Sequence, residues 1–140
     1  MKKTVFLGGT CAGSGWRDRL IPKLEADCFD PVVNDWNEEA MKKEIKAKDE
    51  SDVCLYVLTP ASDSPFSIAE VVDDSNKRPS KVVFHFMKKD EVNGTVFEYN
   101  PHQLKALDKI GKLIRSNGAQ YAETEEELIA IIGPVLEQAL

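Results

Sequence analysis

Glu70 is the residue of this sequence whose type and position best suit covalent chemistry. It closes the segment Ser67-Ile-Ala-Glu70, which follows an apolar run at 53–58 and a loop of Thr, Pro, Ser and Asp at 59–66. A carboxylate at the start of a helix gains from the positive end of the helix dipole, so we expect it to stay ionised at neutral pH. An ionised, fixed carboxylate facing a cleft can attack C1 of a sugar and form a covalent glycosyl intermediate, which an acceptor then resolves.

The same four residues also match a purely structural pattern. Ser-x-x-Glu is the capping box, in which Glu70 would bond back to Ser67 and close the first turn of a helix. The spacing alone favours the cap, so both interpretations stay open. A second carboxylate would have to protonate the leaving base. Asp63 follows the same strand and is well placed to approach a ligand, whereas Asp52 precedes the strand, at its opposite end.

A glycine-rich loop earlier in the chain is a candidate ligand loop. Gly8-Gly-Thr-Cys-Ala-Gly-Ser-Gly15 follows an apolar run at 4–7, and its glycines allow positive φ and close approach of the backbone to a ligand. Its spacing matches neither G-x-G-x-x-G nor the P-loop, whose lysine it lacks. The loop either binds a ligand, through residues such as Gly9 and Thr10, or is a strand-to-helix connection that needs special backbone angles.

Two further groups combine an aromatic ring with polar side chains. Trp16-Arg17 follows the glycine-rich loop; its indole can stack on a base or cover the core, and its guanidinium can hold an anion or be solvated. Asn34-Asp35-Trp36 offers the same chemistry where a second strand is expected to end. Asp35 or Asn37 serves equally well as the N-cap of the following helix.

Strand-like and helix-like runs alternate along the chain and would bring these loops together. Strands are predicted at 4–7, 28–33, 53–58, 81–86 and 119–122, and helices at 16–26, 37–48, from about 67, 100–116 and from 124. Such alternation gives right-handed crossovers and a parallel sheet with helices on both faces. We therefore predict an α/β fold: a single doubly wound domain over residues 1–140, with a five-stranded, mainly parallel sheet of flavodoxin-like or Rossmann-like type. Ligands bind such sheets beyond the carboxyl ends of the strands, here the loops at 8–15, 34–36 and 59–67.

Charged helix positions are expected to face solvent. The helix at 37–48 is rich in Glu and Lys, and we expect its charges to lie opposite an apolar face with Ala40, Met41 and Ile45. Asp73-Asp74, one turn beyond Glu70, is expected to be solvated in the same way. In the segment 87–100, Asn93-Gly94 indicates a tight turn, which suits either a lid or a hairpin.

Composition narrows the classes of function. The 18 basic and 24 acidic residues give a net charge of −6, which disfavours binding to bulk nucleic acid or a polybasic membrane anchor. We find no membrane-spanning run and no secretory signal, so we expect a cytoplasmic protein. Cys11, Cys28 and Cys54 form no C-x-x-C pair, and His85 and His102 are the only histidines. We therefore expect reduced thiols and no metal or other cofactor.

The segment from the first strand to Val83 resembles the nucleoside 2-deoxyribosyltransferase-like family, which is related to nucleoside 5′-monophosphate glycosidases. The resemblance lies in Val5-Phe-Leu-Gly-Gly-Thr10, Trp16-Arg17, Asp35-Trp36, Ser51-Asp-Val-Cys-Leu-Tyr-Val-Leu-Thr-Pro60 and Ser67-Ile-Ala-Glu70. It implies that Glu70 attacks C1 of a deoxyribose and that Asp52 assists near the base. Ser64 stands six residues before Glu70, where the family places an Asp or Ser that handles the sugar 5′ end. The chain departs from the family by Val71-Val72 after its glutamate, where x-Gly is common, and by a loop rich in Ser and Pro.

Three functions are compatible with these features. The first is an enzyme, a transferase or a hydrolase of nucleotide metabolism, that cleaves or exchanges the N-glycosidic bond of a deoxynucleoside or its monophosphate. Glu70 would be its nucleophile, assisted by Asp52, and the nucleoside or nucleotide would contact Gly9, Thr10, Trp16, Arg17, Asp35, Trp36, Ser64 and Ser67. The second is a non-catalytic nucleotide-binding or sensing domain of the same fold, in which Glu70 is a cap. The third is a structural or interaction protein. The resemblance also implies a homo-oligomer.

Overall fold

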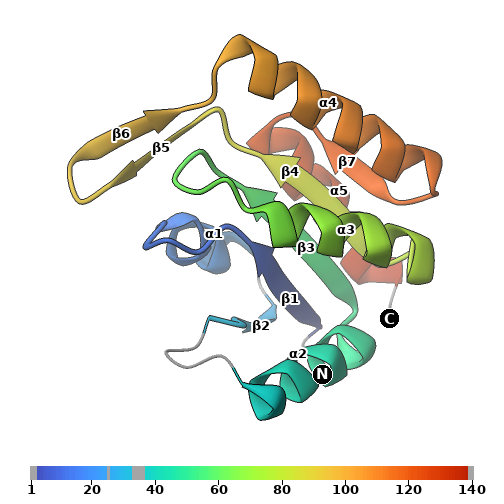
Figure 1. Cartoon of the computed structure of the whole chain (residues 1–140). Coiled ribbons are helices and arrows are strands. Elements are labelled where there is room, and N and C mark those ends of the chain that lie inside the picture. Colours follow the sequence, from blue (N-terminus) through green and yellow to red (C-terminus); the bar gives the residue numbers. More distant parts are fainter. Residues whose placement is uncertain (1–2, 25, 33–36, 139–140) are drawn as a thin grey trace.

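The structure of the chain is a computed structural model that describes residues 3–24, 26–32 and 37–138. Strands and helices alternate along most of this length (Figure 1). The strands are β1 (Thr4–Gly9), β2 (Asp27–Phe29), β3 (Val53–Leu58), β4 (Val82–Phe86), β5 (Lys89–Val92), β6 (Thr95–Glu98) and β7 (Gln120–Ala122). The helices are α1 (Trp16–Leu24), α2 (Glu38–Glu50), α3 (Pro65–Lys77), α4 (Pro101–Ser116) and α5 (Glu125–Gln138).

Five of the strands form one parallel sheet in the order β2-β1-β3-β4-β7. This confirms the predicted doubly wound α/β fold and its flavodoxin-like strand order. The chain leaves β1 toward β2 on one side and returns to β3 on the other, so the strand order reverses between β1 and β3. In open sheets of this kind a crevice forms at that point, beyond the carboxyl ends of the two strands.

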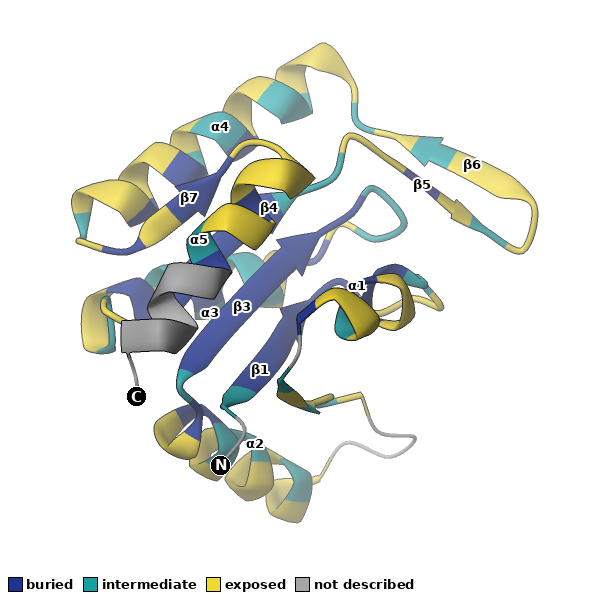
Figure 2. Cartoon of the chain, turned by 180° about the vertical axis from the view of Figure 1, so that it is seen from behind, coloured by how far each residue is buried: buried dark blue, intermediate teal, exposed yellow. Residues whose placement is uncertain are grey.

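Alternate residues of each central strand enter separate apolar clusters on the two faces of the sheet. Val5 and Leu7 pack toward α1 and α5, whereas Phe6 and Tyr56 pack toward α3 and α4. All six residues of β3 are buried. In Figure 2 the central strands have the dark blue of buried residues, and the outer sides of the helices have the yellow of exposed ones. The short apolar runs of the sequence are therefore strands covered on both sides, as predicted.

Two expectations about loops are settled by the backbone. Residues 87–100 contain an antiparallel hairpin of β5 and β6 rather than a lid, and its turn has positive φ at both Asn93 (51°) and Gly94 (82°), as a two-residue hairpin turn requires. The second strand covers only 27–29 instead of 28–33, and it lies at the edge of the sheet. The chain leaves this edge just before Pro31, which has no N–H to donate to a ladder.

The predicted apolar face of α2 is wrong. Met41 and Ile45 are 44% and 50% exposed, whereas Glu44 and Lys48 turn inward, with side chains only 13% and 9% exposed. Asp74, predicted to be solvated, is 2% exposed. The physical reason is that Lys48 on α2 pairs with Glu70 and Asp74 on α3, so burial of these charges is compensated by pairing.

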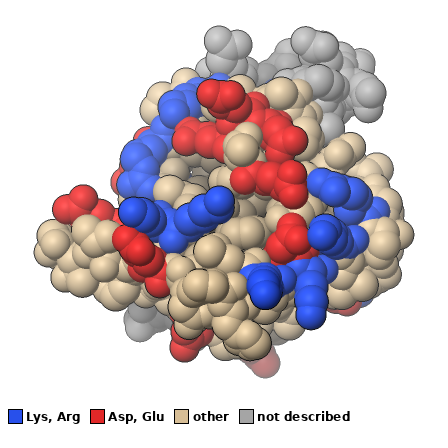
Figure 3. All heavy atoms as spheres, turned by 90° about the horizontal axis from the view of Figure 1, so that it is seen from above, with Lys and Arg blue, Asp and Glu red and all other residues tan. Residues whose placement is uncertain are grey.

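Acidic and basic side chains are interspersed on the surface seen from above in Figure 3, without a broad field of one sign. In the part of the chain that the structure describes, no helix combines the length and apolar character that a membrane crossing requires.

We expect Asn100→Ala to lower the free energy of unfolding by about 1 kcal/mol. Asn100 is the N-cap of α4: its side chain accepts from the backbone N–H of Gln103 at 2.8 Å, and the Gln103 side chain accepts from the Asn100 N–H at 2.9 Å. Alanine removes the bond that the Asn100 side chain accepts, whereas the backbone N–H of residue 100 can still donate to Gln103. Urea denaturation measures the loss, and Lys105→Ala on the exposed face of the same helix is the control. Equal losses in the two variants would argue against the cap.

Candidate functional site

A cavity lies at the reversal of strand order, where β1 ends and α3 begins. Its volume of about 310 Å³ is at the lower end of the range of small-molecule sites, about 300–1,000 Å³. It is lined by Gly8, Gly9, Cys11, Arg17, Pro31, Val32, Glu44, Phe66, Ser67 and Glu70. Four of the residues predicted from the sequence, Gly9, Arg17, Ser67 and Glu70, are therefore brought together.

Gly9 allows β1 to end against the backbone of β3. It has a φ of +114°, and a Cβ atom there would lie 2.0 Å from the carbonyl oxygen of Val57. The next residue, Thr10, donates its N–H to the same oxygen at 3.0 Å. Only glycine fits this close approach, which opens the backbone of residues 8–9 to the cavity.

Hydrogen bonds of Thr10 and Ser64 connect the loops that follow β1 and β3. The hydroxyl of Thr10 accepts from the N–H of Thr59 at 2.9 Å and lies 2.9 Å from the hydroxyl of Ser64. Both Thr10 and Ser64 are buried, and neither lines the cavity. Their position supports the shape of the site, and a direct contact of either with a ligand remains a prediction.

Arg17 is buried at 4% exposure and uses most of its guanidinium on backbone carbonyls. It donates to the carbonyls of Leu7 at 3.1 Å and Thr10 at 2.8 Å, and it forms an ion pair with Asp30 at 3.4 Å. Burial lowers the pKa of Arg17, and the neighbouring Cys11 and Asp30 oppose that shift. The guanidinium group of Arg17 thus holds the glycine-rich loop in place. Arg17 also lines the cavity.

Glu70 is not a helix cap. The N-cap of α3 is Ser64, which makes no side-chain capping bond, and the helix begins at Pro65. Ser67 is therefore already inside the first turn, so the capping-box interpretation of Ser67 and Glu70 is wrong. Because Glu70 lies in the second turn, its carboxylate is free of any capping role, and the residue lines the cavity.

A charged cluster between α2 and α3, which we call the α2–α3 cluster, surrounds Glu70. Lys48 Nζ lies 2.5 Å from Glu70 Oε2 and 3.1 Å from Asp74 Oδ2. Asp74 also accepts from the Tyr56 hydroxyl and pairs with Arg78 at 2.5 Å. The cluster consists of Glu44, Lys48, Tyr56, Glu70, Asp74 and Arg78.

Glu44 is the carboxyl group of this cluster whose pKa is raised. Burial raises its pKa to about 8, helped by a side-chain hydrogen bond and the negative charge of Glu70, while Lys48 acts in the opposite direction. Burial lowers the pKa of Lys48, but its hydrogen bond to Glu70 and the charges of Glu70 and Asp74 outweigh that effect, so the pKa is raised. At neutral pH the cluster therefore contains a protonated Glu44 beside a charged Lys48.

The raised pKa of Glu44 also predicts that the stability of the fold depends on pH. Its pKa is about 8 in the fold against 4.5 in the unfolded chain, so its stabilising contribution is complete below pH 4.5 and is lost as pH rises through 8. We expect wild type to lose up to about 1.4 kcal/mol of unfolding free energy per pH unit relative to Glu44→Gln in that window. Urea denaturation of both proteins from pH 5 to 8 measures the difference, and parallel curves would contradict the raised pKa.

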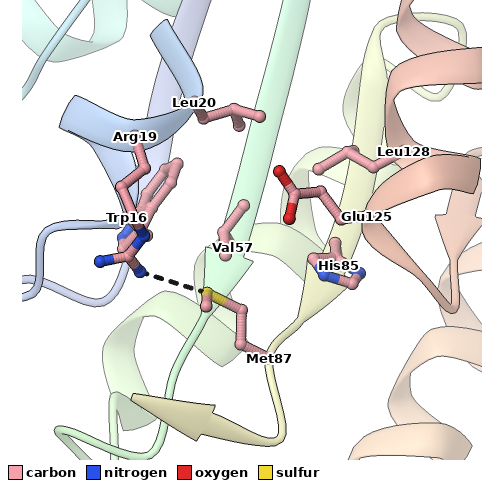
Figure 4. A pocket seen from close by; sticks show the side chains of 8 residues that line it. All are labelled: Trp16, Arg19, Leu20, Val57, His85, Met87, Glu125 and Leu128. Atoms are coloured by element: carbon pink, nitrogen blue, oxygen red, sulfur yellow. Dashed lines mark hydrogen bonds between the residues drawn. The ribbon is translucent and has the colours of Figure 1, made fainter. Parts of the chain in front are cut away.

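A second cavity lies on the opposite face of the sheet, between α1 and α5 (Figure 4). Its volume is only about 40 Å³, enough for a few water molecules and too small for a nucleoside. Trp16 lines this cavity, is 2% exposed, and donates its indole N–H to the Thr10 carbonyl at 2.8 Å. Figure 4 also shows His85, whose pKa burial lowers and whose Nδ1 lies 2.9 Å from the Ala122 carbonyl oxygen. The structure thus does not bring Trp16 to the larger cavity.

The remaining predicted residues lie elsewhere. Asp52 stands at the amino end of β3, where its carboxylate accepts from the N–H of Thr4 at 2.9 Å, so it is not brought near Glu70. Asp35 and Trp36 lie outside the described residues. Within residues 3–24, 26–32 and 37–138, no group of three or more His, Cys, Asp or Glu side chains is arranged to hold a metal ion.

Sequence reasoning missed Glu44, Lys48 and Phe66. Glu44 and Lys48 have the ordinary i, i+4 spacing of a solvated helix pair, and their partners on α3 are more than 20 residues away. Phe66 is 65% exposed at the start of α3 and lines the cavity. The sequence signal near Phe66 is Pro65, whose preference for the first helical position marks where the helix begins.

Comparison with known proteins gives one family match. Residues 2–89 match the family model described as nucleoside 2-deoxyribosyltransferase like, and this segment includes every residue that lines the larger cavity. No curated protein matches the chain. Since the match covers more than half of the 140 residues, the chain belongs to the nucleoside 2-deoxyribosyltransferase-like family.

Proposed function

We propose that the protein cleaves or exchanges the N-glycosidic bond of a deoxynucleoside or a deoxynucleoside monophosphate, with Glu70 as the nucleophile. The observation that carries this proposal is the carboxylate of Glu70, which lines a nucleoside-sized cavity at the reversal of strand order and has no capping role. The family match, which implies glycosyl transfer on nucleosides, supports the same chemistry.

The reaction follows from the position of a carboxylate opposite a leaving base. Glu70 attacks C1 of the sugar, the C1–N bond breaks, and the base leaves with the bonding electron pair and takes up a proton. The covalent glycosyl–Glu70 intermediate is then resolved by water, in hydrolysis, or by a second base, in transfer. Asp52 has no part in this scheme, because it lies at the amino end of β3.

The cavity contains groups suited to both parts of the substrate. Phe66 and Val32 are 65% and 50% exposed and offer apolar surface on which a base can pack. The hydroxyl of Ser67 and the backbone of Gly8 and Gly9 offer hydrogen-bonding groups near Glu70. We assign the sugar to the side of Ser67 and Glu70, and the base to the rim.

A non-catalytic nucleotide-binding or sensing domain is the second candidate. The observation that favours it is the contact of 2.5 Å between Lys48 Nζ and Glu70 Oε2, which makes Glu70 part of a structural ion pair. In that case ligands would raise the melting temperature without being converted.

A chromatographic assay for free base distinguishes the two candidates. Purified protein is incubated with a panel of deoxynucleosides and deoxynucleoside monophosphates, with and without a second base as acceptor. Base release or exchange by wild type establishes the glycosidic chemistry, and dependence on the acceptor separates transfer from hydrolysis. Ligand-induced stabilisation without release across the whole panel would establish the binding domain instead.

We also propose a cytoplasmic, homo-oligomeric protein. Cys11, Cys28 and Cys54 are all free, which suits a reducing compartment. Light scattering on the purified protein tests the assembly, and a monomeric mass at micromolar concentration would contradict it.

A further inference from the structure

Two carboxyl groups from facing helices share one cation at the wall of the cavity. Glu44 Oε1 lies 3.9 Å and Glu70 Oε2 lies 2.5 Å from Lys48 Nζ. The side chains of Glu44 and Glu70 are each 13% exposed, and they are hydrogen-bonded to each other. Both residues line the larger cavity.

A hydrogen bond between two carboxyl groups requires one proton between them, because an ionised carboxylate only accepts. Lys48 Nζ lies closer to Glu70 than to Glu44 and also contacts Asp74 Oδ2 at 3.1 Å. The carboxyl group of Glu44 is the one farther from this cation, so its negative charge would be offset less. The proton consequently belongs to Glu44, whose O–H donates to Glu70.

We propose that Glu44 is a positioning residue that retains its proton and holds the nucleophile Glu70 by donating a hydrogen bond to it. The proposal rests on the proposed function of Glu70. Glu70 is then fixed from two sides, by the O–H of Glu44 and by the ammonium of Lys48, so its carboxylate faces the substrate in one orientation. Such orientation reduces the freedom that the nucleophile must lose in the transition state.

Geometry excludes Glu44 as the general acid for the leaving base. In a displacement at C1 the nucleophile and the leaving base lie on opposite sides of the sugar carbon, and catalytic carboxyl pairs of retaining enzymes are about 5–5.5 Å apart to span it. Glu44 is in hydrogen-bond contact with Glu70 and so lies on the nucleophile's side. Its proton therefore stays with the pair and is not transferred to the base.

The charged groups that face Glu44 act on its proton in both directions. Glu70 and Asp74 on α3 oppose its ionisation, whereas Lys48 on its own helix favours it, and Arg17 lines the same cavity. Loss of the proton would place a second negative charge against Glu70 and remove its hydrogen bond. We therefore expect the activity of wild type to fall above pH 8 by about tenfold per pH unit.

Glutamine at position 44 tests this role, because its amide donates a hydrogen bond but does not ionise. We expect Glu44→Gln to retain the base-release rate of wild type within about threefold at pH 7 and to lose the alkaline fall. Glu38→Gln, an exposed change on the same helix, should keep the wild-type pH profile. An alkaline fall that persists in Glu44→Gln, or a loss of about 100-fold at pH 7, would overturn the proposal.

A titration separates this inference from the proposed function. Carbon NMR of protein labelled at the glutamate carboxyls should show one resonance that titrates near pH 8 and is absent from Glu44→Gln. This measurement needs no turnover, so it decides the carboxyl pair even if the substrate panel gives no reaction. A Glu44 resonance that titrates near pH 4.5 would overturn the pair, whereas absent base release with an intact pair would overturn the proposed function and the positioning role with it.

Discussion

Glu70→Gln is expected to lower kcat/KM for base release by on the order of 10⁴-fold or more while leaving the fold intact. Glutamine has nearly the shape of glutamate, but its amide is not a nucleophile toward C1. Its carbonyl oxygen can still accept from Lys48, which also keeps Asp74 as a partner at 3.1 Å. The chromatographic assay measures the loss, and circular dichroism checks the fold.

The matched control is Asp73→Asn, which removes a carboxylate from the solvated side of the same helix. Asp73 is 56% exposed and pairs with Lys77, also on α3, at 2.7 Å, so we expect no change in turnover. If Glu70→Gln keeps base release within about tenfold of wild type, Glu70 is not the nucleophile.

Lys48→Met is expected to lower the free energy of unfolding by about 3–5 kcal/mol. Lys48 has a side chain only 9% exposed, and it contacts the carboxylates of Glu70 at 2.5 Å and Asp74 at 3.1 Å. Methionine fills much of the same space but leaves these buried charges without their shared cation. Arg78 remains as a partner of Asp74, so the main uncompensated charge is that of Glu70. Urea denaturation at pH 7 measures the loss.

Lys46→Met on the same helix is the control for this change. Lys46 is 73% exposed and lies 3.9 Å from Glu50, and pairs of this kind contribute about 0.3–0.5 kcal/mol. A loss in Lys48→Met no larger than that in Lys46→Met would show that the α2–α3 cluster does not depend on its lysine.

The positions of the strands could be predicted because they depend on patterns that neighbouring residues carry. Val53–Leu58 is apolar at every position, which only a strand covered on both faces requires. The inward position of Glu44 and Lys48 could not be predicted in the same way. A charged residue on a helix is solvated by default, and the exception depends on Glu70 and Asp74, which are more than 20 residues away in the sequence and contact Lys48 only in the folded chain.

The candidate site was predictable in its location but not in its details. The rule for parallel sheets places Gly9 and Glu70 at the same edge, and the cavity contains both. Pro65 could have distinguished the two interpretations of Glu70, as helix cap or as nucleophile. Proline favours the first position of a helix, so Pro65 places Ser67 inside the helix. The direction of Trp16 depends on how α1 packs on the sheet, which the spacing within the helix does not determine.

The pairing of β4 with β7 has a consequence for the segment that the family match covers. The match ends at residue 89, whereas β4 is hydrogen-bonded on its outer side to residues 120–122. A fragment cut at residue 89 would leave Val82, Val83 and Phe84, each at most 1% exposed in the whole chain, on an open strand edge. Open apolar edges template pairing between molecules and lead to aggregation. The last third of the chain thus covers the outer edge of β4 and prevents strand pairing between copies of the segment that the family match covers.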